Sequence, residues 1–155
     1  MNRYGLIGEQ LGHSFSPQIH ALLGEYPYGL YPLPPDDLPA FVQAGDLAGY
    51  NVTIPYKQAV IPFLQQLSDV ARRTGSVNTV TRLPDGALKG DNTDYAGFRL
   101  MLGDVQHVRG RKALVLGSGG AAATVRAVLQ DAGLTPVTIS RSGPDNYQNL
   151  HRHRD

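Results

Sequence analysis

Apolar residues recur along the chain in two patterns, one typical of strands and one typical of helices. Residues 4–8 form a short apolar run that predicts a first strand. Ser16 is a favourable N-cap residue, and Ile19, Leu22 and Leu23 follow it at the spacing of an apolar helix stripe. The pattern therefore predicts a strand followed by an amphipathic helix.

The same order of elements then repeats. Residues 28–33 predict a strand, and residues 36–44 predict a helix. Within residues 49–54, Val52 and Ile54 alternate with polar residues, which is the period of a strand. This succession of strands and helices favours an α/β sheet with crossover helices.

The next segments predict a hairpin added to that sheet. Residues 59–67 predict an interrupted helix, and residues 68–75 predict a short one. Residues 76–83 alternate strongly, and a Pro-Asp-Gly turn at 84–86 leads to a partner strand at 87–90. We therefore expect an amino-terminal α/β domain with a mixed sheet.

Residues 110–155 predict the first half, β-α-β, of a Rossmann domain. A continuous apolar run at 112–116 is typical of a parallel strand buried on both faces. The sequence Gly-Ser-Gly-Gly-Ala-Ala follows at 117–122, and a helix to about residue 132 then leads to a strand at 137–140. Strand, glycine turn and helix in this order are the signature of a dinucleotide-binding unit. The alternative is a glycine-rich turn without a ligand.

The end of the second strand bears on the choice of cofactor. Arg141 stands there between two serines, without the acidic residue that binds a ribose 2′-hydroxyl. Because an arginine accepts a 2′-phosphate, the sequence favours NADP over NAD, and a plain surface arginine is the alternative. The predicted cofactor-binding residues are Gly117, Ser118, Gly119, Gly120, Ala121, Ser140, Arg141 and Ser142.

Composition narrows the classes of partner. The 155 residues carry 14 basic and 13 acidic side chains, a net charge of +1, so we expect no nucleic-acid or membrane surface and a small-molecule partner. The absence of cysteine excludes disulfides and thiolate catalysis, and we predict no metal site. No apolar run approaches 18 residues and no signal peptide is visible, so we expect a cytoplasmic protein. We place a domain boundary between Gly103 and Gly110, which gives domains 1–103 and 110–155.

Lys57 is the first candidate for chemistry. Pro55 ends the predicted strand because it cannot donate a ladder hydrogen bond, and Lys57 follows at the carboxyl side of that strand. Open α/β sheets bind their ligands at this edge. The alternative interpretation is a solvated lysine at the start of a helix.

Five separated segments together resemble the shikimate dehydrogenase family: 13–17 (His-Ser-Phe-Ser-Pro), 49–57, 77–79 (Val-Asn-Thr), 92–94 (Asn-Thr-Asp) and 117–122. The resemblance covers nearly the whole chain. It implies an amino-terminal substrate domain followed by a Rossmann domain. It also implies reversible, NADP-linked interconversion of 3-dehydroshikimate and shikimate, a step of aromatic amino-acid biosynthesis.

The resemblance also implies roles for single residues. Ser14 and Ser16 correspond to the hydroxyls that hold the substrate carboxylate, and Thr53, Asn78 and Asp94 correspond to the groups that hold the ring hydroxyls. The simpler alternatives are structural: a loop serine, a helix cap at Ser16, a hairpin asparagine and an N-cap aspartate.

Lys57 and Asp94 correspond to the catalytic pair of the family. An ammonium group beside the reacting carbonyl can stabilise and protonate the oxygen that gains negative charge. A carboxylate beside it would orient it and compensate its charge.

The carboxyl-terminal part of the family pattern is missing. A doubly wound domain has six strands, whereas residues 110–155 contain only two predicted strands. We therefore expect a fragment of a longer enzyme, or a chain completed by another copy through strand pairing, as in a homodimer. A catalytically silent substrate-binding fragment and a quinate-preferring dehydrogenase remain the alternative functions.

Overall fold

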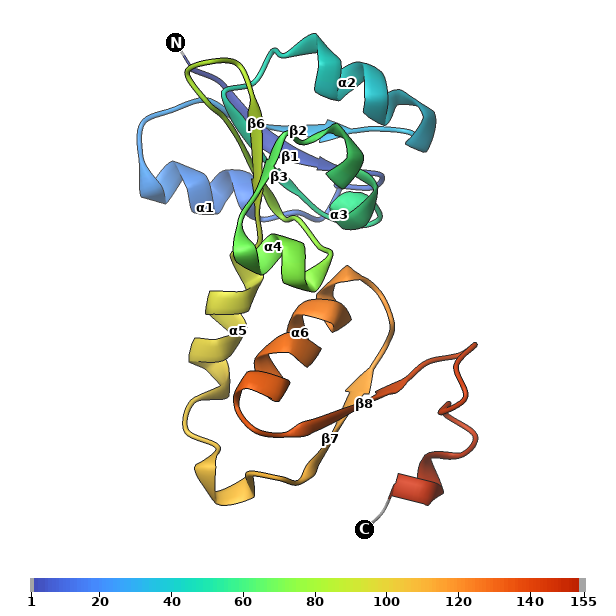
Figure 1. Ribbon diagram of the computed structural model, residues 1–155. Helices are drawn as coiled ribbons and strands as arrows, with labels where there is room; N and C mark the ends of the chain where they lie inside the picture. Colours follow the sequence, from blue (N-terminus) through green and yellow to red (C-terminus); the bar gives the residue numbers. More distant parts are fainter. Residues whose placement is uncertain (1, 154–155) are drawn as a thin grey trace. The chain divides into compact units, whose positions relative to one another are not determined.

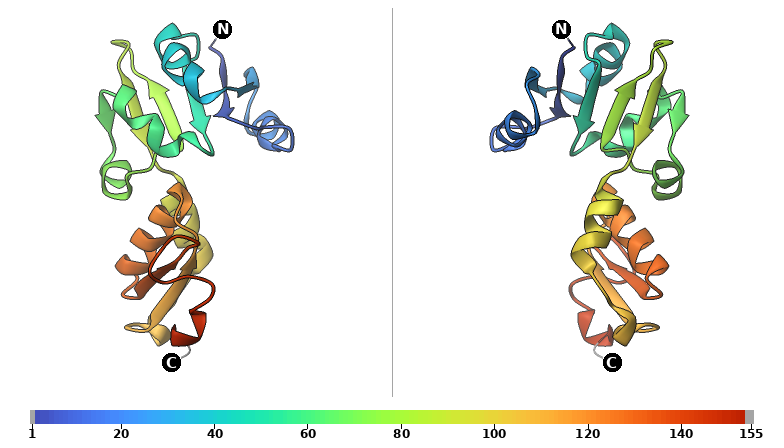
Figure 2. Two further views of the ribbon diagram at one scale, coloured as in Figure 1. Left: turned by 90° about the vertical axis from the view of Figure 1, so that its right-hand side faces the viewer. Right: turned by 90° about the vertical axis from the view of Figure 1, so that its left-hand side faces the viewer.

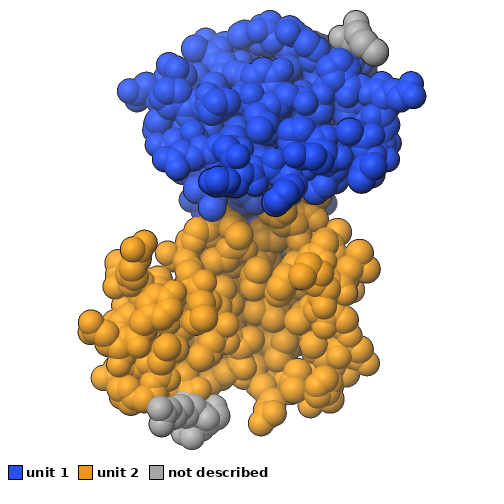
Figure 3. All heavy atoms as spheres, turned by 180° about the vertical axis from the view of Figure 1, so that it is seen from behind, with its two compact units in different colours: residues 1–92 blue, residues 93–155 orange. Residues whose placement is uncertain are grey.

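The computed structural model describes residues 2–153 (Figures 1 and 2). Residues 1–92 and 93–155 form two compact units, called here the first and the second unit (Figure 3). Among the described residues, no helix combines the length and the apolar character needed to cross a lipid bilayer.

The first unit is built on a six-stranded sheet. Its strands are β1 (Tyr4–Gly8), β2 (Tyr28–Pro32), β3 (Gly49–Val52), β4 (Gln66–Leu67), β5 (Thr79–Arg82) and β6 (Leu88–Asp91). The strand order is β2-β1-β3-β5-β6-β4, in which β1 is parallel to β2 and β3 while β5 is antiparallel to β3 and β6. The predicted α/β class with a mixed sheet is confirmed.

The two faces of this sheet differ in chemistry. Ile7 of β1 pairs with Val52 of β3, and Tyr50 of β3 pairs with Val80 of β5, so these four side chains share one face. All four are at most 5% exposed. Asn51, one residue away from Tyr50 and Val52, belongs to the opposite face. One face therefore holds the core, and the other carries polar groups.

Helices cover both faces. They are α1 (Ser16–Leu23), α2 (Leu38–Ala44), α3 (Tyr56–Ala59) and α4 (Asp69–Thr74). Buried residues of α2, α3 and α4 join the core on the apolar face, whereas α1 lies on the other side of the sheet (Figure 2). There His20 of α1 stacks on Tyr28 of β2. The polar face is thus covered in part by α1.

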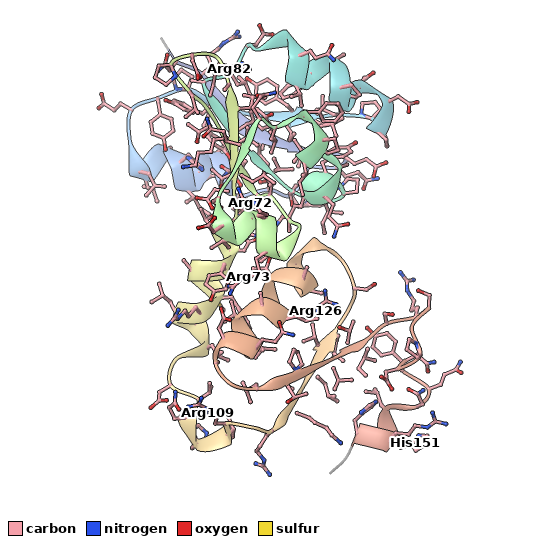
Figure 4. The ribbon with its side chains drawn as sticks, in the orientation of Figure 1. Arg72, Arg73, Arg82, Arg109, Arg126 and His151 are labelled. Atoms are coloured by element: carbon pink, nitrogen blue, oxygen red, sulfur yellow. The ribbon has the colours of Figure 1, made fainter. Side chains whose placement is uncertain are left out.

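The second unit contains a single β-α-β unit preceded by a helix. Its elements are α5 (Asp94–Leu102), β7 (Lys112–Leu116), α6 (Gly120–Asp131) and β8 (Thr135–Ile139). β7 and β8 are parallel, with Leu116 opposite Ile139. Arg126 of α6 donates a hydrogen bond to the hydroxyl of Thr138 on β8 (Figure 4). This arrangement confirms the predicted first half of a Rossmann domain.

The second unit begins earlier in the chain than the predicted second domain. Tyr95 of α5 donates a hydrogen bond to the Asp131 carboxylate of α6, and α5 packs against α6. α5 is therefore part of the second unit. The functional domains 1–103 and 110–155, of which residues 1, 154 and 155 lie outside the described range, stay a prediction.

The prediction for α1 was wrong at its N-cap and right for its apolar stripe. Ser16 is the first helical residue and does not cap the helix, because Phe15 occupies the N-cap position. The predicted apolar stripe forms, but Ile19, Leu22 and Leu23 are 54%, 88% and 69% exposed. Helical spacing determines which residues share a face, but not what covers that face.

The interrupted helix predicted for residues 59–67 was also wrong. α3 ends at Ala59, a 3₁₀ turn spans Ile61–Phe63, and β4 follows. Proline at the second position of that turn disfavours continuation of an α-helix, and the edge of β6 offers unpaired backbone groups. Long-range pairing with β6 therefore prevails over the local pattern.

Candidate active site

The carboxyl end of β3 brings the first predicted substrate residue beside β1. The backbone N–H of Thr53 donates to the carbonyl of Ile7 at 2.9 Å. Gly8 follows Ile7, and a Cβ atom at Gly8 would lie 2.6 Å from Cγ2 of Thr53. The close approach of Thr53 therefore requires a glycine at position 8.

Lys57 and Asn78 are held at the same edge by backbone hydrogen bonds. The carbonyl of Lys57 accepts from the N–H of Val77 at 2.7 Å, and the carbonyl of Asn78 accepts from the N–H of Val52 at 2.8 Å. Lys57 lies in α3 and is partly buried. The structure thus brings Thr53, Lys57 and Asn78 together at one end of the sheet.

Asn78 is almost fully buried at 9% exposure, and its side chain has defined partners. Its Oδ1 accepts from the hydroxyl of Thr79 at 3.0 Å. Its backbone N–H donates to the carbonyl of Asp91 at 3.0 Å, which ties it to β6. These bonds fix the asparagine between β3 and β6, so it is not a freely solvated hairpin residue.

The two predicted carboxylate-binding serines contact each other. The hydroxyl of Ser14 donates to that of Ser16 at 3.1 Å, and the backbone N–H of Ser16 donates to the Ser14 hydroxyl at 3.2 Å. Both serines are partly exposed. Because Ser16 does not cap α1, the simple capping interpretation of this residue is wrong.

Three residues that the sequence did not single out connect these predicted groups. The phenol of Tyr28 donates to Oδ1 of Asn51 at 2.7 Å, and Nδ2 of Asn51 donates to the hydroxyl of Thr79 at 3.3 Å. The Ser16 side chain lies close enough to Tyr28 to lower its pKa. A polar network therefore runs from Tyr28 through Asn51 to Thr79, with the serine loop beside it.

The period-two alternation of polar residues was the one sequence signal for part of this network. It places Asn51 and Thr53 on the same face of a strand, but it does not show that Thr79 lies opposite Asn51. No local signal separates Tyr28 from the other tyrosines of its segment. These contacts arise from strand register, which is a tertiary property.

The electrostatics of Tyr28 keep it a hydrogen-bond donor. Burial raises the pKa of Tyr28 to about 12, with a smaller lowering by the nearby Ser16 side chain and a further raising by Tyr26. The phenol is therefore protonated at neutral pH and can donate to Asn51.

Asp94 belongs to the second unit, where it is the first residue of α5. Thr93 occupies the N-cap position, so the interpretation of Asp94 as an N-cap is wrong. Lys57 belongs to the first unit. The pairing of Lys57 with Asp94 stays a prediction.

The glycine turn of the second unit has the geometry expected of a phosphate site. Gly117 has a φ of +122°, and its N–H donates to the carbonyl of Ile139 at 2.8 Å. No heavy atom lies within 4 Å of a Cβ placed on Gly117 or on Gly119. α6 begins at Gly120, so its first N–H groups lie at this open turn. The turn therefore leaves room for a pyrophosphate.

The serine-arginine-serine segment lies at the same edge as the turn. Leu116 and Ile139 are paired, so Gly117 and Ser140 follow at the carboxyl ends of adjacent strands. Ser140 is 9% exposed and donates its N–H to the carbonyl of Asp145, whereas Arg141 and Ser142 are exposed. The structure thus brings all eight predicted cofactor residues to one edge, and they fit the phosphate-bearing end of NADP.

The chain is similar in sequence to known proteins along most of its length. The model of the shikimate dehydrogenase substrate binding domain matches residues 6–80. Shikimate dehydrogenase (NADP(+)) of a Synechococcus strain is 42% identical over 153 residues, which cover 92% of this chain and 51% of the relative. The Clostridium beijerinckii enzyme is 43% identical over 148 residues, with coverages of 90% and 54%. The chain spans about half the length of the curated relatives it matches.

Solved structures agree with the sequence matches. A chorismate mutase/shikimate 5-dehydrogenase fusion protein from Clostridium acetobutylicum superposes with a TM-score of 0.83 at 37% identity, covering 98% of this chain and 62% of the other. Shikimate 5-dehydrogenase from Thermus thermophilus, solved with NADP(H) and shikimate, gives a TM-score of 0.80 at 33% identity, covering 99% of this chain and 61% of the other.

Proposed function

Because the chain belongs to the shikimate dehydrogenase family, we propose that it carries the substrate-binding half of an NADP-linked enzyme that interconverts 3-dehydroshikimate and shikimate. The observation that carries this proposal is the gathering of Thr53, Lys57 and Asn78 at one end of the sheet. Ser14 and Ser16 contribute two hydroxyls that contact each other. Hydroxyl, amide and ammonium groups in this arrangement suit a polyhydroxylated carboxylic acid.

Each polar group has a proposed role in holding the substrate. Ser14 and Ser16 donate to its carboxylate, because hydroxyl donors suit an anionic acceptor. Thr53, Asn78 and Asp94 contact the ring hydroxyls. The almost complete burial of Asn78 supports this role, since its amide orientation is fixed before the ligand arrives.

Lys57 is the proposed acid–base residue. NADP, when bound, supplies or accepts the hydride at the carbonyl carbon. The ammonium of Lys57 stabilises the negative charge that develops on the substrate oxygen during reduction and delivers the proton to it. In the reverse direction the amine takes that proton. Asp94 is proposed to orient the lysine.

The second unit is proposed to bind the phosphates of NADP. Gly117 and Gly119 leave space for the pyrophosphate, which the first N–H groups of α6 meet. Exposed Arg141 accepts the 2′-phosphate, assisted by Ser140 and Ser142. Ser118, Gly120 and Ala121 complete this turn.

A second candidate function is a binding fragment without catalytic activity. It is favoured by the two-stranded sheet of the second unit, which leaves Leu114 and Leu116 of β7 39% and 65% exposed next to the glycine turn. In this case shikimate binds to the first unit but the dinucleotide is held too weakly for hydride transfer.

Separate titrations distinguish the two functions. Isothermal calorimetry with shikimate, quinate and NADP, each added alone, reports which ligands the chain binds. Spectrophotometric NADP reduction with shikimate then reports turnover. Turnover supports the enzyme, and shikimate binding without NADP binding supports the silent fragment. Failure to bind shikimate or quinate contradicts both, and a preference for quinate would identify a quinate dehydrogenase.

Replacement of Lys57 tests the catalytic role in whichever assembled or longer form is active. Lys57→Ala should lower kcat by about 10² or more with little change in shikimate affinity, as expected for the loss of a general acid. Lys89→Ala, which removes an exposed lysine of β6, is the matched control. Unchanged turnover in Lys57→Ala removes this lysine from the mechanism.

A further inference from the structure

We propose that Tyr28 is a positioning residue that sets the substrate affinity of this site by fixing the Asn51 amide. The proposal rests on the proposed function, because it assigns a role within the same site. Tyr28 lies on the polar face of the sheet, at the first position of β2.

The hydrogen bonds of Tyr28 determine how the Asn51 amide is oriented. The carbonyl of Asn78 can only accept, so Nδ2 of Asn51 faces it at 3.4 Å, with the Thr79 hydroxyl at 3.3 Å. This leaves Oδ1 directed to Tyr28, whose phenol donates to it at 2.7 Å. The amide is therefore held at both ends in one orientation.

The ring of Tyr28 is itself held in place. His20 of α1 stacks on it with a centroid separation of 3.7 Å and an interplanar angle of 12°. Nδ1 of His20 lies 2.8 Å from the hydroxyl of Tyr26, which fixes the imidazole in turn. These contacts hold the ring of Tyr28 in place, so that its hydroxyl faces Asn51.

Tyr28 also lies beside two parts of the chain that are distant in sequence. Its hydrogen-bond partner, Asn51, lies on β3, and the Ser16 side chain, which contacts Ser14 at 3.1 Å, lies close enough to Tyr28 to lower its pKa. Because burial raises the pKa of Tyr28 to about 12, its hydrogen bond to Asn51 persists throughout the neutral pH range.

Removal of the phenolic oxygen tests the role. Tyr28→Phe keeps the stacked ring but leaves Oδ1 of Asn51 without its donor. We expect shikimate binding to the 155-residue chain to weaken about tenfold by calorimetry, in line with the loss of one neutral hydrogen bond. The melting midpoint should move by only a few degrees.

Tyr31→Phe is the matched control. Tyr31 lies on the same strand but on the opposite face, where its ring packs against Phe41. It should leave shikimate affinity within about twofold of the wild type. A second control is a thermodynamic cycle: in an Asn51→Ala background, Tyr28→Phe should have a smaller effect, because part of its role passes through Asn51.

A nuclear magnetic resonance measurement separates positioning from general stability. The side-chain amide signals of Asn51 should shift and broaden in Tyr28→Phe, and remain unchanged in Tyr31→Phe. If the wild type fails to bind shikimate, the proposed function fails, while these amide signals still test the positioning role. Equal shikimate affinity in wild type and Tyr28→Phe, unchanged Asn51 signals, or unfolding of the variant would overturn the inference.

Discussion

The two compact units place similar apolar strand residues in different surroundings. In the first unit, Ile7 and Val52 lie in a six-stranded sheet whose apolar face is closed by three helices. In the second unit, β7 and β8 form a two-stranded sheet with α6. Leu114 and Leu116 of β7 are 39% and 65% exposed. The first unit has a closed core, whereas the second leaves part of β7 uncovered.

This contrast predicts that the two predicted sites differ in how well they are ordered. The substrate edge of the first unit is supported by strands on both sides of β3, so its polar groups are fixed by backbone bonds. The glycine turn is supported by a sheet in which the outer edge of β7 has no strand partner within residues 93–153. We expect the first site to be the better ordered of the two.

The largest expected effect comes from one substitution made in both units. Ile7 and Ile139 are both fully buried strand residues. Ile7→Ala should destabilise the first unit by about 3 kcal/mol, because its surroundings are rigid on all sides. Ile139→Ala should destabilise the second unit by less, about 2 kcal/mol, because a two-stranded sheet can relax around the cavity.

Hydrogen exchange measured by mass spectrometry resolves the two units in one experiment. The loss of protection in Ile7→Ala should fall on β1, β3 and β5, and that in Ile139→Ala on β7 and β8. Equal losses of free energy would contradict the idea that the second unit has the less rigid core.

Alkaline pH should destabilise the first unit by an amount comparable to that expected for the isoleucine substitutions. Burial raises the pKa of Tyr50 to about 12, against a smaller lowering by Arg82, and burial also raises the pKa of Tyr28 to about 12. Above pH 10 the unfolded chain releases phenolic protons that the folded unit still holds. The contribution of these two phenols to stability should therefore be constant below about pH 10 and fall between pH 10 and 12, by about 2 kcal/mol for the buried Tyr50.

Urea unfolding at pH 9 and pH 11.5, followed by circular dichroism, checks this loss. The Tyr50 hydroxyl has no hydrogen-bond partner among the described residues, so Tyr50→Phe should fold and should show a smaller alkaline decline. A decline of the same size in that variant would assign the effect to other groups.

The smallest expected effect on stability concerns the uncovered strand. An exposed apolar edge invites pairing with a second chain, so we expect concentration-dependent association in light scattering. Leu116→Lys should reduce this association severalfold and change stability by less than about 0.5 kcal/mol, because the side chain is already largely exposed.

Leu22→Lys provides the control for that prediction. It removes an even more exposed leucine, at 88%, from the α1 helix of the first unit. If Leu22→Lys suppresses association and Leu116→Lys does not, the chains associate through the exposed face of α1 and not through the edge of β7.

Local sequence patterns predicted most helices and strands. They failed where a segment pairs with a strand that is distant in sequence. The strands at Tyr4–Gly8 and Lys112–Leu116 and the glycine turn were clear from the sequence, because alternation, apolar runs and glycine spacing are local properties. β4 was not predicted, because Gln66 and Leu67 become a strand only by pairing with Lys89 and Gly90.

The sequence by itself determined the chemistry available to this protein: an ammonium, several hydroxyls, an amide and a glycine-rich turn, each at a recognisable position in a strand or helix pattern. Only the tertiary structure decided which of them meet. Parallel and antiparallel pairing brought Thr53, Lys57 and Asn78 to one end of the sheet and placed Tyr28 against Asn51. The physical reason is that the alternation of side chains between the two faces of a sheet can be read along one strand. The register between strands depends on the packing of the whole sheet.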